Sequence, residues 1–203
     1  MKKFLVLFLA LLYPVVAIEP NKATQTQIQD YLNGITALVS DFVQTNPDGD
    51  KVRGKLWLKR TGAEGGKLRI DYEKRIPQRI IALKNNLYIY DLNTNEKPEP
   101  QDLGNMPAAF ILQNKIDLTK DAVFEIPVKS PDGHFLSIRL TDPAPLTLMF
   151  SLYPNGNIKG LAGWVLEDSH GLICVDLVDV QDNNASLVQA DLFVPPFKDI
   201  VVN

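Results

Sequence analysis

Residues 54–92 contain four short stretches in which apolar and polar side chains alternate, separated by Gly- and Asn-rich turns. Successive side chains of an extended chain point to opposite faces, so each stretch forms a strand with one apolar and one polar face. The turns between them are short enough for neighbouring strands to pair in antiparallel fashion. The run therefore predicts a sheet whose apolar face needs cover, and that face is the best lead to function.

The same alternation recurs along the rest of the chain, between turn sequences such as the PDG at 131–133. We expect eleven strands, at 37–45, 54–60, 67–73, 79–83, 87–92, 122–129, 134–141, 146–153, 158–167, 172–180 and 187–194. With so few helices, this pattern predicts a mainly β, α+β fold in one domain, built as a large curved antiparallel sheet or barrel.

A helix is predicted over residues 21–33. Asn21 can cap its first turn and Gly34 is placed to end it. Apolar residues recur near helical spacing, so one stripe of the helix should face the sheet.

The strand pattern stops between residues 93 and 120, where a short helix is predicted to begin near Pro107. Its residues Phe110, Ile111 and Leu112 are too apolar for a surface in water. This segment is therefore expected to cover another part of the molecule.

The first residues have the pattern of an export signal. Two lysines precede the apolar stretch 4–12, and small residues end at Ala17. We predict a signal peptide over 1–17, cleaved after Ala17, and one domain over 18–203. Ile18, and not a cysteine, would begin the mature chain, so no lipid anchor is expected. Retention as an uncleaved anchor is the alternative, which Pro14 disfavours because it interrupts the signal segment.

Charge and cysteine content exclude several classes of function. The whole chain has a formal charge of -3, and removing the two signal lysines leaves -5. Lys and Arg do not cluster, so nucleic acid and anionic membranes are poor partners. Cys174 is the single cysteine. It lies in an apolar run and is expected to be a small buried residue rather than a reactive thiol.

Catalytic and metal-binding motifs are missing from the sequence. His134 and His170 both lie at turns, where surface positions are expected, and HExxH, CxxC, GxSxG and P-loop patterns are absent. Ser169 and His170 are neighbours in a tight turn, which we expect to prevent productive contact. The chain is predicted to be neither an enzyme nor a cofactor-binding protein.

Six segments taken together resemble a known family. They read GKLWLKR, LRIDYE, IIALKNNLYIYD, MPAAFILQNKIDL, WVLEDSHG and LFVPP, and the resemblance covers about residues 37–196. In order and spacing they resemble outer-membrane lipoprotein carrier proteins of the LolA type. The resemblance implies an open, incomplete β-barrel whose apolar cavity is lidded by helices. It also implies a periplasmic chaperone that takes lipoproteins from an ATP-driven inner-membrane transporter to an outer-membrane acceptor.

The resemblance also assigns roles to residues. Arg60 matches a strand-end arginine that ties down the lid helices. This chain departs from the family in the loop after it, where Thr61 precedes GAEGG. Asn105 is expected to cap the lid helix, because Met106 occupies the usual place of a small hydroxyl residue. Met106, Phe110, Ile111 and Leu112 form the expected lid, with Phe110 and Leu112 moving when cargo enters.

The expected cavity lining combines strand alternation with the face that the family uses. The candidates are Leu56, Leu58, Leu68, Ile70, Tyr72, Leu146, Leu148, Phe150, Trp164 and Leu166.

Three functions remain open after these steps. The first is a lipoprotein carrier, and the second is a carrier of another lipid or lipid-linked intermediate on the same fold. An enzyme acting on lipid head groups is the third, and would need inward-facing polar clusters that the alternation does not predict. A monomer is expected, since the lid would hide the apolar area.

Overall fold

The structure is a computed structural model that describes residues 22–61, 65–73, 77–94, 96–119, 122–125, 129–130, 133–140 and 146–194. The predicted signal peptide and the capping residue Asn21 lie outside these residues. Among the described helices, none combines the length and the apolar composition that a bilayer crossing requires.

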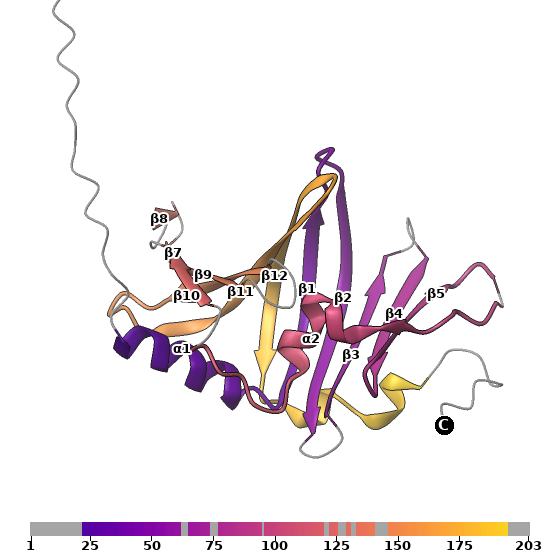
Figure 1. Cartoon of the computed structure of the whole chain (residues 1–203), viewed down its shortest axis with the longest axis horizontal. Helices are drawn as coiled ribbons and strands as arrows, with labels where there is room; N and C mark the ends of the chain where they lie inside the picture. Colours follow the sequence, from indigo (N-terminus) through magenta and orange to yellow (C-terminus); the bar gives the residue numbers. More distant parts are fainter. Residues whose placement is uncertain are drawn as a thin grey trace, which may run out of the picture.

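Twelve strands form one antiparallel sheet (Figure 1). They are β1 (Ala37–Thr45), β2 (Lys51–Thr61), β3 (Gly65–Tyr72), β4 (Gln78–Leu83), β5 (Asn86–Asp91), β6 (Gln101–Asp102), β7 (Ala122–Glu125), β8 (Lys129–Ser130), β9 (Gly133–Leu140), β10 (Leu146–Leu152), β11 (Ile158–Asp168) and β12 (Gly171–Asp182). Their order is β6-β5-β4-β3-β2-β1-β12-β11-β10-β9-β7, and β8 pairs with β9.

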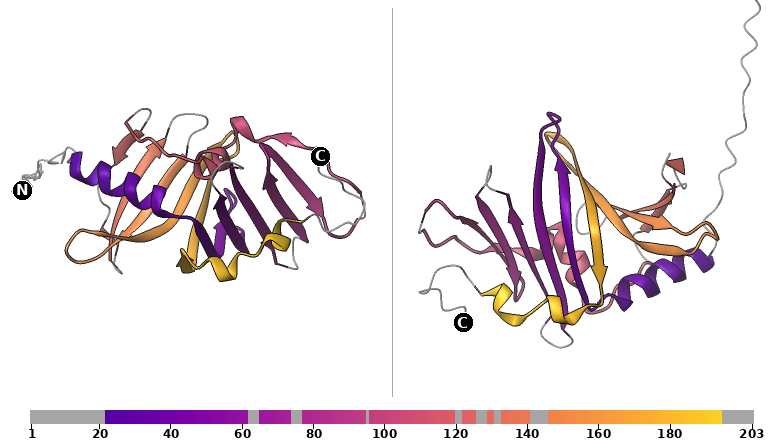
Figure 2. Two further views of the ribbon diagram at one scale, coloured as in Figure 1. Left: turned by 90° about the horizontal axis from the view of Figure 1, so that it is seen from below. Right: turned by 180° about the vertical axis from the view of Figure 1, so that it is seen from behind.

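Two meanders make up this sheet, and the pairing of β1 with β12 joins them. The first contains β1 to β5 and the second β9 to β12, as expected for strands linked by tight turns. The two halves curve toward each other, and β6 and β7 remain as separate edges (Figures 1 and 2). The expectation of an open, incomplete antiparallel barrel with few helices is confirmed.

Two α-helices cover the concave side. Helix α1 (Lys22–Gly34) lies along the β9–β11 half, and α2 (Pro107–Leu112) lies in front of β1 to β3 (Figures 1 and 2). Both helices were expected, although Gly34 is the last helical residue and not the first residue beyond it. Ile28 and Leu32 of α1 and Phe110 of α2 join the inward side chains of the sheet in one core.

The expected strand at 187–194 is wrong, because two 3-10 helices, η3 (Ala185–Leu187) and η4 (Ala190–Phe193), occupy this region. Val188 and Phe193 are 1% and 3% exposed and pack together on the convex face of β1. They are five positions apart, so a strand would direct them to opposite faces. Folding into short helices lets both side chains reach the same surface.

Several strand limits also differ from the expected ones. β2 begins at Lys51, before the expected start at Gly54, because β1 supplies pairing partners as far as Thr45 opposite Lys51. The expected strand 122–129 appears as β7, with 126–128 outside the described residues, and β6, β8 and a 3-10 turn η2 (Leu103–Asn105) were not foreseen. Cys174 is only partly buried, not fully as expected.

Candidate functional site

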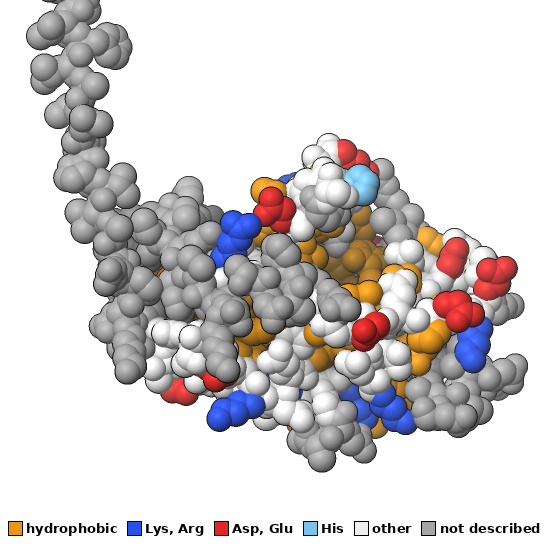
Figure 3. Space-filling view, viewed as in Figure 1, with side chains coloured by type: hydrophobic (Ala, Val, Ile, Leu, Met, Phe, Trp, Pro, Cys, Tyr) orange, Lys and Arg blue, Asp and Glu red, His pale blue; other side chains and the backbone are white. Residues whose placement is uncertain are grey.

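An apolar cavity of about 270 Å³ lies between the concave face of the sheet and α2. In the space-filling view, apolar side chains line a hollow in the middle of this face (Figure 3). Among the described lining residues, Gln44 is the one outside the apolar and aromatic classes. The lining residues are Leu38, Phe42, Gln44, Leu56, Leu58, Leu68, Ile70, Tyr72, Ile80, Leu87, Met106, Ala108, Ile111, Leu146, Leu148, Leu161, Trp164, Leu166 and Val175.

Most of the lining residues expected from the sequence lie at this cavity. Phe150 is the exception among the ten candidates, because its ring is 0% exposed in the core. It meets the ring of Tyr31 edge to face, with centroids 6.1 Å apart. Its burial stabilises the docking of α1 on the sheet, by about 1.5–3 kcal/mol for a large apolar side chain.

Sequence reasoning missed part of the lining, including Leu38, Phe42 and Gln44 of β1. These residues alternate at even positions, so the period of two that identified the strand also places them on one face. Val175 of β12 joins them because it pairs directly with Gln44. That pairing joins the first strand of the chain to the last, so no local pattern could reveal it.

Helix α2 divides its side chains between cavity and core. Met106, Ala108 and Ile111 line the cavity, whereas Phe110 and Leu112 are 6% and 5% exposed and pack in the core. Met106 occupies the N-cap position without a side-chain hydrogen bond, so the expected cap at residue 105 is wrong. Proline at the first helical position starts the helix instead, since its fixed φ is already helical.

A glycine lets α2 approach the sheet closely. A Cβ atom at Gly66 would lie 2.7 Å from Leu112 Cδ2 and 2.8 Å from the Leu112 carbonyl oxygen. Such contacts are too short for any larger residue without movement of the helix. The glycine-rich loop that departs from the family pattern therefore ends at a residue against which α2 packs.

Arg60 connects both helices to the end of β2. Its Nη1 donates to the Leu32 carbonyl oxygen in α1, while Nε, at 3.0 Å, and Nη2 donate to the Gln113 carbonyl oxygen just after α2. Burial lowers the pKa of the guanidinium, which stays charged at neutral pH. The planar group reaches carbonyls from two separate helix ends at once.

A ladder of side-chain amides joins α1 to the segment that follows α2. Gln25, Gln29 and Asn33 lie four residues apart on one face of the helix. Asn33 Nδ2 donates to the Ile116 carbonyl oxygen at 2.9 Å, and its Oδ1 accepts from the Ile116 N–H at 2.8 Å. Gln29 accepts from the Leu118 N–H, and Gln25 donates to the Leu118 carbonyl. The amides thus satisfy backbone groups in a segment that belongs to no helix or strand of the described chain.

Tyr31 fixes the other side of α1 to the sheet. Its hydroxyl accepts from the Leu161 N–H at 2.9 Å and donates to Asp182 Oδ2 at 3.3 Å. Burial raises the pKa of Tyr31 to about 12, with the Asp182 charge acting in the same direction against the opposing Leu161 hydrogen bond. The phenol therefore remains neutral and can serve as both donor and acceptor at physiological pH.

On the convex face, the side chain of Asp71 is only 23% exposed. It binds Arg69 and Arg79 together, with Oδ1 2.7 Å from Arg79 Nε. Arg69 also donates to the Leu192 carbonyl oxygen and lies over the Trp57 ring, 5.0 Å from its centroid. This cluster fixes the C-terminal 3-10 helix to the outside of the sheet.

Within the residues that the structure describes, groups that resemble catalytic or metal sites are few. Ser169 Oγ lies 3.3 Å from His170 Nδ1, so the two side chains do meet, but both residues are exposed on the β11–β12 turn and neither lines the cavity. His134 has no described side chain. In the described part of the chain, no group of three His, Cys, Asp or Glu side chains is arranged for a metal ion.

The fold and the cavity define the class of protein: an open β-barrel whose helices cover an apolar interior. Residues 33–195 match the family model described as outer membrane lipoprotein carrier protein LolA, and the chain belongs to this family.

Comparison with known proteins gives further relatives. An uncharacterised protein of Rickettsia prowazekii (strain Madrid E) is 25% identical over 210 residues, covering 97% of this chain and 92% of the relative. The crystal structure of an uncharacterised conserved protein from Thermus thermophilus has a TM-score of 0.54 at 16% identity, covering 88% of this chain and 96% of that one. A LolA superfamily protein from Nitrosomonas europaea has a TM-score of 0.37 at 13% identity, covering 82% and 98%.

Proposed function

We propose that the protein is a periplasmic carrier that holds the acyl chains of lipoproteins during their passage from the inner to the outer membrane. The observation that supports this function most directly is the apolar cavity under α2, in a chain of the lipoprotein-carrier family. A concave, mostly apolar pocket with few polar groups is typical of sites for apolar ligands. The role requires binding and release, with no chemical change in the cargo.

The energetics of the cargo explain why such a carrier needs partners. At about 0.8 kcal/mol per buried methylene, three chains of about fifteen carbons represent on the order of 35 kcal/mol against exposure to water. Protein sites rarely exceed about 18–21 kcal/mol of binding free energy. The carrier therefore requires an ATP-driven transporter to release the cargo and an outer-membrane acceptor to receive it.

The size of the cavity sets a condition on this function. Dividing 270 Å³ among about 45 methylene groups leaves about 6 Å³ for each, whereas a single water molecule needs about 10–15 Å³ of cavity volume in the same measure. Three acyl chains therefore enter only if α2 moves outward or part of the cargo stays outside. The contacts of Arg60 are well placed to control this movement, because they hold the ends of both helices.

The same volume supports a second candidate function. A cavity of about 270 Å³ is slightly smaller than the usual range for ligand sites, about 300–1,000 Å³. It suits a single-chain lipid without rearrangement, so a carrier for another lipid or lipid-linked intermediate is the alternative.

The test is to express the full chain in a bacterial host with an outer membrane, purify it from the periplasm and identify bound molecules by mass spectrometry. Ile111→Asp places a charge at the cavity, and Leu172→Asp, at a 53% exposed position of β12, is the matched control. We expect bound lipoprotein with the wild type and the control, and little with Ile111→Asp.

Other outcomes separate the proposals. Free lipid without lipoprotein would favour the second carrier function. Binding that Ile111→Asp leaves unchanged would show that the cavity is not the binding site. A protein without ligand, and without affinity for added acylated peptides, would contradict both functions.

A further inference from the structure

Among the described residues that line the cavity, Tyr72 and Gln44 are joined by a side-chain hydrogen bond. Tyr72 Oη donates to Gln44 Oε1 at 3.0 Å, and Gln44 Nε2 donates to Asn46 Oδ1 at 2.7 Å. Tyr72 and Gln44 both line the cavity. Among the described lining residues, the side chains with N–H or O–H groups are those of Tyr72, Gln44 and Trp164. Polar groups in an apolar pocket are the ones that orient a ligand.

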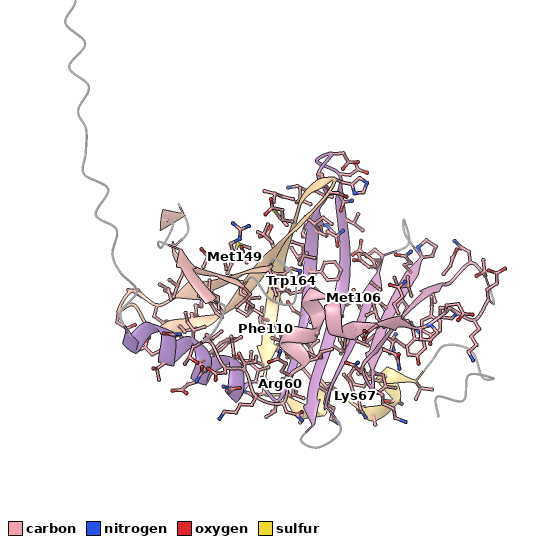
Figure 4. All side chains as sticks on the ribbon, in the orientation of Figure 1. Arg60, Lys67, Met106, Phe110, Met149 and Trp164 are labelled. Atoms are coloured by element: carbon pink, nitrogen blue, oxygen red, sulfur yellow. The ribbon has the colours of Figure 1, made fainter. Side chains whose placement is uncertain are left out.

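Tyr72 and Gln44 lie together at the end of the cavity opposite Arg60. Strands β1 and β3 run in the same direction because both are antiparallel to β2. Gln44 is the next-to-last residue of β1 and Tyr72 the last of β3, so both lie at one end of the sheet. Arg60 pairs with Gly66 near the start of β3, at the other end. Figure 4 shows Arg60 and Lys67 at that end, with Met106 and Trp164 away from it.

The distance between the two ends suits one acyl chain. Tyr72 lies six positions after Gly66 in β3, which corresponds to about 20 Å of strand. Each leaflet of a bilayer provides about 15 Å of hydrocarbon, half of a core about 30 Å thick. An acyl chain of this length that points toward Arg60 therefore has its polar linkage near Tyr72 and Gln44.

The chemistry of the pair matches such a linkage. The Gln44 amide has two N–H groups, and Asn46 accepts one of them. The second N–H remains for a carbonyl oxygen, and the Tyr72 oxygen keeps lone pairs for a donor. Burial raises the pKa of Tyr72, which keeps the phenol protonated. The ring of Tyr72 meets Phe42 edge to face at 5.5 Å, so the hydroxyl has a fixed position.

We infer that Gln44 and Tyr72 form a polar recognition point for the ester or amide carbonyl of a bound acyl group, and orient the cargo with its acyl chain toward Arg60. This inference rests on the proposed carrier function. On this inference, Gln44 and Tyr72 make the site specific for acyl linkages, whereas the rest of the cavity accepts any hydrocarbon chain of suitable size.

The experiment compares two probes that differ in the carbonyl alone: a monoacylglycerol, and the alkylglycerol ether of equal chain length. Their affinities are measured by displacement of a fluorescent apolar dye from the full chain. We expect the wild type to bind the ester about 2- to 12-fold more tightly, the range of one neutral hydrogen bond. Gln44→Leu removes this preference and keeps the affinity for the ether.

Two further variants separate recognition from a structural role. Tyr72→Phe keeps the ring packing but leaves Gln44 without its donor, and should reduce the ester preference. Ile80→Val shortens another lining residue and should weaken both probes equally, with an unchanged ratio. Equal affinities of the wild type for both probes, or a preference that survives Gln44→Leu, would overturn this inference alone. A wild type that binds neither probe would overturn it together with the carrier function.

Discussion

Replacing Arg60 by leucine tests whether this residue holds the two helices over the cavity. Leucine retains much of the aliphatic stem but donates no hydrogen bond. The carbonyl oxygens of Leu32 and Gln113 then lose their shared partner. Because these groups lie at separate helix ends, a single substitution should loosen α1 and α2 together.

The expected magnitude follows from the hydrogen bonds that are lost. A hydrogen bond to a charged group contributes about 1.5–3 kcal/mol net. The Arg60 guanidinium is only half-buried, so water partly replaces it, and we take about 1 kcal/mol for each of the two carbonyls. The total of about 2 kcal/mol corresponds to about a 30-fold increase in the equilibrium constant for opening the helices.

Native-state hydrogen exchange measures this opening residue by residue. We expect the amides of Ile116 and Leu118, which bond to α1, to exchange about 30-fold faster in Arg60→Leu. Amides in the centre of β1 and β12 should be nearly unaffected. Arg53→Leu, at an exposed position of β2, is the matched control and should change neither set.

Two results would refute the reasoning. Unchanged exchange at Ile116 and Leu118 would mean that Arg60 does not hold the helices. Equal acceleration in the helices and in the sheet would mean that the substitution lowers global stability and opens nothing selectively.

Three further substitutions give independent tests by urea unfolding. Asn33→Ala removes both hydrogen bonds to one backbone residue, so we expect a loss of about 1–3 kcal/mol; no loss would mean that the amide ladder is replaced by water. Gly66→Ala should lower the free energy of unfolding by about 1–3 kcal/mol because the new Cβ would overlap α2. Gly34→Ala, whose Cβ would have no atom within 4 Å, should be neutral or slightly stabilising. Equal effects of the two substitutions would contradict the close packing of α2. For Asp71, burial opposes ionisation, but two arginine partners lower its folded-state pKa overall. Its contribution to stability is therefore present above the unfolded pKa of about 3.9 and is lost as pH falls through the lower folded value. The stability difference between wild type and Asp71→Asn should accordingly be constant above about pH 5 and shrink below about pH 4, and a difference independent of pH would exclude this role.

Much of the fold was predictable because strand alternation is a local property of the chain. The period of two located ten of the eleven expected strands and grouped residues such as Leu56 and Leu58 on one face, whereas the choice of the inward face came from the family resemblance. It failed at 187–194, where apolar residues also recur in a short stretch. There the shape of the convex face required Val188 and Phe193 on one side, which a strand cannot provide.

The candidate site was predictable in part for the same reason. Alternation gives the members of each face, but it does not decide which residues meet across the sheet. Phe150 was expected at the cavity and lies in the core, since Tyr31 of α1 covers it. Phe110 and Leu112 were expected as the mobile lid residues, yet Met106 and Ile111 face the cavity.

The sequence by itself determined the strand-rich class, the family and the apolar character of the interior, because these depend on residue type and on spacing within one element. The tertiary structure alone decided the contacts that give the site its form. Asn33 meets a backbone segment 83 residues away, and Gln44 meets Tyr72 across an intervening strand. Such contacts depend on the register and curvature of the whole sheet, which no local period of the sequence encodes.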